Sequence, residues 1–277
     1  MIRHHLARKL TALLALLLVS MAIVAPVQAA PLAGRNSQQC VNHKHIETWR
    51  SRRQLEQKGF YFDIIGDQAS ITFGKNLSLD LASDPSNADY TASRITEIES
   101  ELPIAERVKC WEATSSKDVV VEFRVRFDQA APPPGLTENL FLWNAPLPHP
   151  DNPEPPIPIT AVGVSRNNGV YSALVAQDFD FTTFSGLLVT QPMPGWLDAA
   201  DWHRVRTTLS QERATIEVAQ GEHGYTEILE VALPHPAGPL GFEFSVDNEA
   251  FPGVFVPVTV PDGLDVDFLD IRLARSR

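Results

Sequence analysis

The chain has 277 residues, of which 44% are hydrophobic and 21% are charged, and its formal net charge is −11. This length fits one domain of ordinary size behind an N-terminal export segment, and it is too short for two full β-sandwich domains. An acidic chain binds nucleic acid and anionic membrane surfaces poorly, so neither is an expected partner.

Residues 1–29 have the pattern of a secretory signal peptide. Three basic residues precede an apolar run over residues 10–24, and residues 27–29 form a small-residue cleavage site. The apolar run is shorter than the roughly 20 residues that a membrane span needs. We therefore expect a secreted or extracytoplasmic protein that has no membrane contact after cleavage. An uncleaved N-terminal anchor is the alternative.

The only two cysteines are Cys40 and Cys110. An even cysteine count in an exported chain predicts a disulfide between them, because oxidising compartments preserve such bonds. In the chain-entropy model, closing a loop of this length stabilises the fold by roughly 4 kcal/mol. The bond would tie the N-terminal segment to the edge of the fold. The alternative is a reactive thiol, which has no acid or base pattern nearby.

Residues 30–118 are predicted to add one helix and several strands to the same domain. Helix-forming residues, charged on most faces, predict a helix from His43 to Lys58 that ends at Gly59 and packs Trp49 on the fold. Turn signals that contain Gly separate the strands predicted next, which cover residues 61–65, 69–73 and 77–81.

An acidic segment follows, in which Glu97, Glu99 and Glu101 alternate with other residues. On a strand these three side chains would share one face. The pattern resembles the catalytic strand of laminarinase-type glycoside hydrolases, in which two carboxyl groups about 5 Å apart serve a retaining mechanism. The three glutamates are therefore catalytic candidates. A solvated acidic strand or turn is the structural alternative, which Pro103 favours.

The strongest alternation in the chain lies in residues 119–127, which we expect to form a central strand. A second strand is predicted over residues 139–144. It lies within a Pro-rich segment, residues 132–158, which holds ten prolines, most of them after the strand. Proline removes a ladder donor and favours extended chain, so this segment predicts a long loop. It leaves the strand at Trp143 and Asn144. We expect it to form the rim of a binding site, and a spacer over a sheet edge is the alternative.

Strands are predicted over residues 159–164 and 170–177, and five more alternating segments follow Asp201, at 201–209, 214–218, 228–233, 240–249 and 264–273. In the fourth of these, Phe242 and Phe244 share one face, while Glu243 and Asp247 share the other. The apolar face predicts a core. We expect the polar face, together with Arg204 and Arg206, to form one charged surface that can hold a ligand. A phase shift between Phe268 and Leu269 predicts a β-bulge.

The order of the C-terminal motifs resembles the concanavalin A-like lectin and glucanase superfamily. The motifs are Trp202-His203 at the start of a strand, Leu240-Gly241-Phe242 running into Asp247-Asn248-Glu249, and Leu264-Asp265-Val266-Asp267-Phe268. The resemblance covers residues 119–273 and implies an all-β fold, a two-sheet antiparallel jelly roll with a concave face, whose main region is 119–277. The superfamily holds lectins, binding modules, glycosidases and lyases, so the fold alone does not choose among these functions.

We predict a non-catalytic protein that binds glycans or associates with the cell surface. A glycan site needs an aromatic platform and nearby amide or carboxylate groups. The residues that we choose for this role are Trp143, Asn144, Trp202, Asp247 and Asn248. One alternative is a polysaccharide hydrolase or lyase, with a carboxylate pair on the concave sheet such as Glu97 with Glu99 or Glu122 with Glu243. The other alternative is a structural extracellular domain without a small ligand.

No motif typical of a zinc peptidase, a nucleotide enzyme or a serine hydrolase occurs, so no cofactor is expected. Calcium is the alternative, because it binds to oxygen ligands. Such ligands are offered by Asp247, Asn248 and Glu249, and by Asp262, Asp265, Asp267 and Asp270. Neither group has a loop signature of fixed spacing, so polar turn and strand residues are the default interpretation.

Overall fold

The computed structural model describes residues 40–87, 89–98, 109–129, 135–144, 158–167, 169–181, 183–251 and 254–276. All of them belong to one compact unit, Gln38–Arg277. The expected signal peptide, Glu99, Glu101 and most of the Pro-rich segment lie outside the described residues. No helix in the described ranges is long and apolar enough to cross a membrane.

The described residues form two antiparallel sheets packed face to face, which confirms the expected jelly-roll sandwich. The strands of the eight-stranded sheet are β1 (His43–Ile46), β3 (Ala69–Phe73), β4 (Leu77–Leu81), β6 (Lys117–Phe127), β11 (His203–Leu209), β12 (Arg213–Gln220), β13 (His223–Ala232) and β17 (Asp262–Arg275). Their order is β13-β12-β11-β6-β17-β4-β3, and β1 pairs with β17. The strand expected to be central, β6, lies in the middle of this order.

The second sheet has seven strands, which are β2 (Tyr61–Ile65), β5 (Ala92–Thr96), β7 (Thr137–Trp143), β8 (Ile159–Asn167), β9 (Val170–Asp180), β10 (Ser185–Pro192) and β14 (Gly241–Asp247). Their order is β10-β9-β8-β7-β14-β5-β2. A short hairpin, β15 (Glu249–Phe251) with β16 (Val254–Phe255), follows β14.

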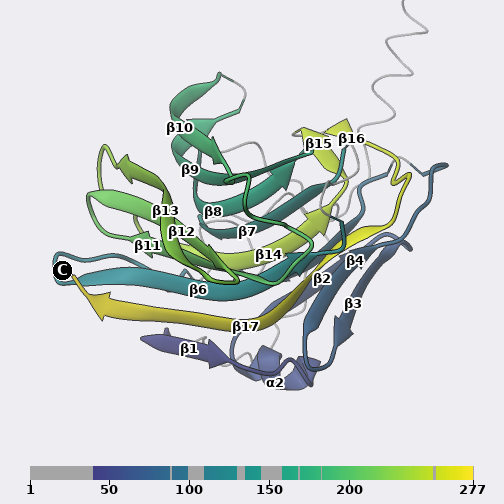
Figure 1. Cartoon of the computed structure of the whole chain (residues 1–277), viewed down its shortest axis with the longest axis horizontal. Coiled ribbons are helices and arrows are strands. Elements are labelled where there is room, and N and C mark those ends of the chain that lie inside the picture. Colours follow the sequence, from purple (N-terminus) through teal and green to yellow (C-terminus); the bar gives the residue numbers. More distant parts are fainter. Residues whose placement is uncertain are drawn as a thin grey trace, which may run out of the picture. The chain divides into compact units, whose positions relative to one another are not determined.

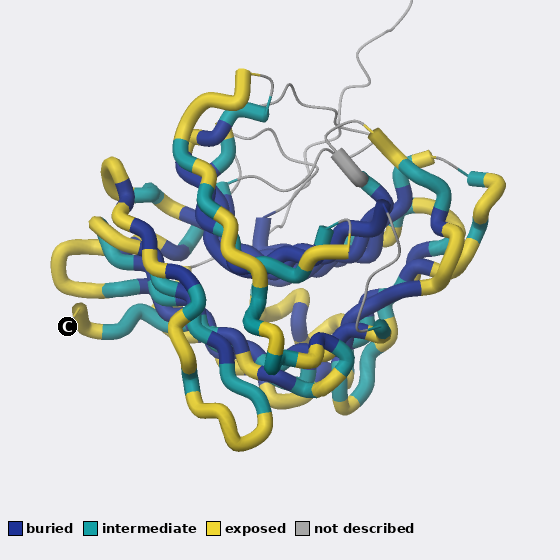
Figure 2. The backbone as a smooth tube through the Cα atoms, turned by 45° about the horizontal axis from the view of Figure 1, so that its top comes forward, coloured by how far each residue is buried: buried dark blue, intermediate teal, exposed yellow. Residues whose placement is uncertain are grey.

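Figure 1 shows both layers bowing toward the side on which β1 and the helix α2 (Arg52–Gln57) lie, so the outer face of the seven-stranded sheet is concave. Figure 2 shows buried backbone running through the middle of both layers, with exposed backbone mainly at the turns. The connections between strands therefore lie around the rim of the sandwich, and the strand centres carry the core.

Aromatic rings from the central strands join the two sheets. Phe123 of β6 packs against Phe242 and Phe244 of β14, with ring centroids 6.3 and 5.4 Å apart, and Trp49 packs on Phe244 at 6.4 Å. All four side chains are at most 1% exposed. The inward faces predicted from the alternation in β6 and β14 are thus confirmed.

The predicted helix over residues 43–58 is wrong in its first part. His43–Ile46 forms the strand β1, which pairs with β17 between Leu269 and Arg272, and only α2 is helical. Ladder hydrogen bonds to β17 and the burial of Ile46 override the local helix propensity. Gly59 adopts a φ of +83° after the helix, as expected of a terminating glycine.

The Cys40–Cys110 disulfide is present, with the Cα atoms 5.1 Å apart, which confirms the expected bond. The predicted bulge in β17 is also present. The pairing with β6 shifts register between Val266 and Phe268, so the extra residue is Asp267, close to the position expected. The shift keeps Leu269 and the alternate residues after it in the core.

Replacing Phe244 with alanine should lower the free energy of unfolding by roughly 3 to 5 kcal/mol, because the cavity would open between the two sheets. Urea denaturation followed by circular dichroism measures this loss. Phe184→Ala is the matched control, since Phe184 is 67% exposed and its replacement should cost less than about 1 kcal/mol. Equal losses for the two variants would contradict the assigned core.

Candidate functional site

The outer, concave face of the seven-stranded sheet carries the main candidate site. On β14 the inward turn of Phe242 and Phe244 forces Glu243, Ser245 and Asp247 to the opposite face. On β7, Phe141 lies opposite Glu243 and Asn139 opposite Ser245. On β5, Thr96 lies opposite Glu243 and Arg94 opposite Ser245. Because directly paired residues share a face, side chains from β5, β14 and β7 meet at the centre of the sheet.

One half of this face is polar. The Ser165 hydroxyl donates to Asn139 Oδ1 at 2.9 Å, and Asn139 Nδ2 donates to Ser245 Oγ at 3.4 Å, so hydrogen bonds link β8, β7 and β14. Arg94 is fully buried and donates from Nε and Nη2 to Asp63 Oδ2 at 3.0 and 2.6 Å. The guanidinium charge is thereby partly neutralised by a carboxylate on β2.

The other half is aromatic and apolar. Phe141 and Trp143 lie with their ring centroids 6.1 Å apart and form a small buried cluster of their own. The other buried members of this cluster are Ile98, Ala161, Ala176 and Phe179. Gly241, opposite Trp143, makes room for this cluster, since a Cβ there would come within 2.2 Å of the Ile98 side chain. Glu243 lies where the aromatic and polar halves meet.

Several buried polar atoms on this face have no hydrogen-bond partner among the described residues. They are Oδ2 of Asp247, both carboxyl oxygens of Glu243 and Nε1 of Trp143, although Trp143 and Thr96 lie close enough to the Glu243 carboxyl group to stabilise its charged form. An unpartnered buried polar group costs about 1 to 3 kcal/mol, and most such groups in proteins are satisfied by protein, water or ligand. Their concentration around one strand therefore marks this face as a candidate binding site.

Burial governs the protonation of the two carboxyl groups. It raises the pKa of Glu243 to about 8, although Arg94 and the nearby side chains of Thr96 and Trp143 oppose the shift. Burial also raises the pKa of Asp247 well above its usual range, against the Glu249 backbone N–H, which donates to Asp247 Oδ1 at 3.0 Å. Burial therefore favours the protonated form of both groups, and a protonated carboxyl group can donate a hydrogen bond to a hydroxyl group.

This protonation suits hydrogen bonding better than acid–base catalysis. A retaining glycosidase needs one ionised carboxylate beside one protonated carboxyl group. Burial favours the protonated form of both Glu243 and Asp247, and Ser245 lies between them on the strand. The two residues are four positions apart, so their Cα atoms are separated by about 13 Å on an extended strand.

The five residues predicted to bind a glycan do not all lie on the concave face. Trp143 and Asp247 lie on the concave face, as described above. Asn144 bridges β7 and β8, because its Oδ1 accepts from Thr160 N at 3.1 Å and its Nδ2 donates to the Pro158 carbonyl at 3.2 Å.

Asn248 is fully buried and also serves the backbone, since Nδ2 donates to the carbonyls of Asp89 and Val256 and Oδ1 accepts from Thr91 N. Trp202 lies on the other sheet, between the guanidinium groups of Arg124 and Arg126, each 5.0 Å from its ring. The sequence analysis did not include Glu243 or Phe141 among the glycan-binding residues, although it named Glu243 as a member of a possible carboxylate pair. The alternation had placed Glu243 on the polar face, but nothing local showed that β7 lies beside it.

Glu97 is a structural carboxylate. It pairs with the Lys44 ammonium group, accepts from Trp111 Nε1 at 2.5 Å and accepts from the Phe242 backbone N–H at 3.1 Å. It is 3% exposed and joins β1 and β14 to the segment around Trp111. The other expected carboxylate pair, Glu122 with Glu243, is wrong, because these residues lie on different sheets.

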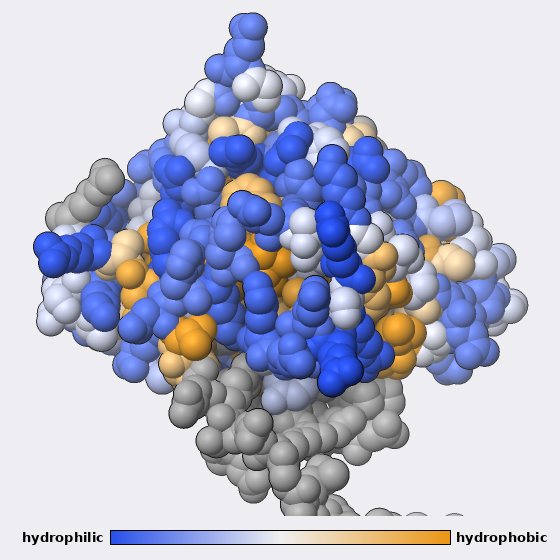
Figure 3. Space-filling view, turned by 90° about the horizontal axis from the view of Figure 1, so that it is seen from below, coloured by the Kyte–Doolittle hydropathy of each residue, from blue (hydrophilic) through white to orange (hydrophobic). Residues whose placement is uncertain are grey.

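The expected shared surface of Arg204, Arg206 and Glu243 is wrong for the same reason. The arginines belong to the outer face of the eight-stranded sheet, where ion pairs compensate the charges. Figure 3 views this side, and hydrophilic residues cover most of it. The pairs are Arg126–Asp265, Arg124–Asp267, Arg206–Glu122 and Arg206–Glu217. The aspartates proposed as calcium ligands on β17 therefore contact basic groups.

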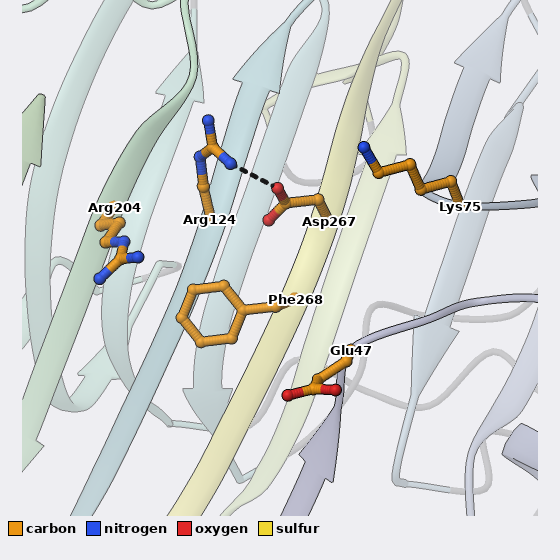
Figure 4. A pocket seen from close by; sticks show the side chains of 6 residues that line it. All are labelled: Glu47, Lys75, Arg124, Arg204, Asp267 and Phe268. Atoms are coloured by element: carbon orange, nitrogen blue, oxygen red, sulfur yellow. Dashed lines mark hydrogen bonds and ion pairs between the residues drawn. The ribbon is translucent and has the colours of Figure 1, made fainter. Parts of the chain in front are cut away.

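A shallow depression of about 210 Å³ lies on this outer face. Figure 4 shows the side chains that line it, which come from β6, β11, β17 and the turns after β1 and β3. They are Glu47, Lys75, Arg124, Arg204, Asp267 and Phe268. Arg124 donates to Asp267 at 2.7 Å, so part of the lining is already paired, and we assign this depression no ligand.

Comparisons with known proteins agree with the fold. The structure is similar to the β-glucanase of Bacillus licheniformis, with 11% identity, a TM-score of 0.55 and coverage of 84% of this chain and 99% of that chain. It is similar to the catalytic domain of an endo-1,3-β-glucanase (laminarinase) from Thermotoga petrophila, with 10% identity, a TM-score of 0.53 and coverage of 87% and 99%.

The structure is also similar to a legume lectin-like domain from Entamoeba histolytica, with 9% identity, a TM-score of 0.51 and coverage of 83% of this chain and 97% of that chain. No protein-family model matches the sequence, and no curated protein matches it either. At these identities the likeness establishes the fold. The chain has the concanavalin A-like jelly-roll fold, as its C-terminal motifs implied.

Replacing Glu243 with glutamine should make stability less dependent on pH. The folded state holds the Glu243 proton up to a pH of about 8, whereas the unfolded state releases it near the ordinary glutamate pKa of 4.5. Unfolding is therefore favoured progressively as the pH rises from about 4.5 to about 8, and the effect is constant above that.

Urea denaturation of both proteins at pH 5, 6, 7 and 8 measures this effect. The stability of Glu243→Gln relative to wild type should rise by roughly 3 kcal/mol over this range. Other buried carboxyl groups titrate equally in both proteins, so the difference reports on Glu243. A difference that stays constant with pH would show that Glu243 is ionised in the folded protein.

Proposed function

We propose that the protein binds a neutral carbohydrate on the concave face of the seven-stranded sheet and does not cleave it. The observation that carries this proposal is the group of buried polar atoms on Glu243, Asp247 and Trp143 that lack a well-formed hydrogen bond, beside the Phe141–Trp143 aromatic pair. A sugar presents apolar ring faces and hydroxyl groups together. This combination matches a site that is aromatic on one side and polar on the other.

The polar groups favour a neutral ligand. Arg94 is already paired with Asp63, and burial favours the uncharged form of Glu243 and Asp247, so the site offers little unpaired charge to a charged sugar. The chain as a whole carries a net charge of −11, which disfavours acidic polysaccharides. Hydroxyl groups can accept from the two carboxyl groups and can exchange hydrogen bonds with the Ser165–Asn139–Ser245 line.

Two further observations support this proposal. The glucanases and the lectin-like domain that share the fold are, by name, proteins of carbohydrate chemistry. The disulfide fits an exported protein, and an exported protein meets extracellular polysaccharides.

The second candidate function is a polysaccharide hydrolase. The observation that favours it is the placement of two carboxyl groups, Glu243 and Asp247, on the same face of one strand. A reducing-sugar assay on β-glucans and other neutral polysaccharides separates the two candidates. Sugar release by the wild type that is abolished in Glu243→Gln would replace the binding proposal with the hydrolase.

The binding proposal is tested by a glycan array, followed by isothermal titration with the glycan that binds. Trp143→Ala and Asp247→Ala should each weaken binding by about 10- to 100-fold, which corresponds to a loss of roughly 1 to 3 kcal/mol. Each variant is first checked for its fold by circular dichroism.

Trp202→Ala is the matched control, because it removes the same side chain from the outer face of the other sheet. Its affinity should equal that of the wild type. If Trp202→Ala weakens binding while Trp143→Ala and Asp247→Ala remain folded and bind normally, the site lies on the eight-stranded sheet and the proposal fails.

A further inference from the structure

The short strand β1 brings together side chains of types that can bind a metal ion, on the outer face of the eight-stranded sheet. His43 and His45 are two residues apart on the strand, so both point outward. The pairing of β1 with β17 sets His45 opposite Asp270 and His43 opposite Arg272. Two imidazoles and a carboxylate, which are 227 and 225 residues apart in the chain, are thus brought together.

Both imidazoles are directed at the same oxygen. His43 Nε2 lies 2.6 Å from Asp270 Oδ1, and His45 Nδ1 lies 3.0 Å from it. The pairing register of β1 with β17 explains which nitrogen of each imidazole faces the Asp270 carboxylate. His45 is directly opposite Asp270 and reaches it with the near nitrogen, whereas His43 is one pair further along and must use the far one. Ligand atoms of all three residues lie within 4.8 Å of one another.

The surrounding groups orient these ligands. Arg272 Nη1 donates to Asp270 Oδ2, which leaves Oδ1 to the histidines. The second nitrogen of His45, Nε2, lies 3.1 Å from Glu47 Oε1. A carboxylate that accepts from the outer N–H of a ligating histidine is a common partner in metal sites, because it fixes the tautomer and the ring orientation.

The strand that carries the histidines is held firmly. Between them, Lys44 points inward to the buried carboxylate of Glu97, and Ile46 is 2% exposed. The Cys40–Cys110 disulfide lies just before the strand. Ligands on an anchored strand require little reordering when an ion binds.

We propose that His43 Nε2, His45 Nδ1 and Asp270 Oδ1 bind a divalent late transition-metal ion, with Zn²⁺ as the best match. Imidazole nitrogens suit zinc, copper and nickel, whereas calcium takes six to eight oxygen ligands. Three protein ligands leave the fourth position of a tetrahedral zinc ion for water or another ligand. The side chains of His43 and His45 are 57% and 44% exposed, so this position faces solvent.

The zinc site is independent of the proposed carbohydrate site. Its residues belong to β1 and β17, whereas the carbohydrate site lies on the outer face of the other sheet. The alternative interpretation of the cluster is a set of ordinary histidine–carboxylate contacts without a metal. Zinc binding measured on the protein alone distinguishes the two, and it does so whether or not any glycan binds.

The test is isothermal titration of the metal-free full chain with ZnCl₂. The wild type should bind one ion at this site, and His43→Gln and Asp270→Asn should each weaken that binding at least about 10-fold. Glu47→Gln should weaken it by about 10-fold, as loss of an orienting carboxylate does. His4 and His5 are present in every variant, so differences between variants report on this site.

His235→Gln is the matched control. His235 is also exposed and also contacts a carboxylate, with Nε2 2.7 Å from Asp178 Oδ2, but this pair has no second imidazole. Its zinc affinity should equal that of the wild type. Saturating Zn²⁺ should also raise the melting temperature of wild type and His235→Gln, and it should not raise that of His43→Gln.

Two results would overturn the proposal. One is the absence of saturable zinc binding to the wild type. The other is wild-type affinity in both His43→Gln and Asp270→Asn when circular dichroism shows that these variants are folded. Because His43 is largely exposed, His43→Gln is expected to fold normally, and it keeps the test decisive if Asp270→Asn does not.

Discussion

The packing of Phe123 against Phe242 and Phe244 is the constraint on which the rest of the structure depends. These rings join the central strands of the two sheets, and side chains on a strand alternate between its faces. Once they point inward, Glu243, Ser245 and Asp247 must point to the concave side. By the same rule Glu122, Arg124 and Arg126 must point to the opposite outer face. The core contact therefore determines the chemistry of both surfaces.

The two outer faces use their polar groups differently. On the eight-stranded sheet, arginines of β6 and β11 meet carboxylates on neighbouring strands, so most charges are compensated at the surface. On the seven-stranded sheet, Glu243 and Asp247 are buried and retain unpartnered oxygens. A ligand that brings hydrogen-bonding groups gains little binding free energy on a surface whose charges are already compensated. It gains more on a buried face with unpartnered atoms, which is why the proposed carbohydrate site lies there.

The N-terminal segment shows how tertiary contacts decide local structure. Residues 43–58 have helical propensity, yet the first of them add a strand to the edge of β17. The buried Lys44–Glu97 contact and the disulfide hold this strand in place. A helix would have turned His43 and His45 by about 200° relative to each other, since each residue advances about 100°. The strand aligns them, and the proposed zinc site exists only because of that alignment.

The sequence by itself determined most of the segments that form strands, which of their faces are buried, and that Cys40 pairs with Cys110. Alternation and turn signals act over a few residues, and a chain with two cysteines offers only one pairing. The tertiary structure decided which strands become neighbours. It set Phe141 beside Glu243, placed Trp202 on the other sheet and joined His43 to Asp270, 227 residues away. Pairing between distant strands depends on the competition of all strands for partners, and no local pattern records its outcome.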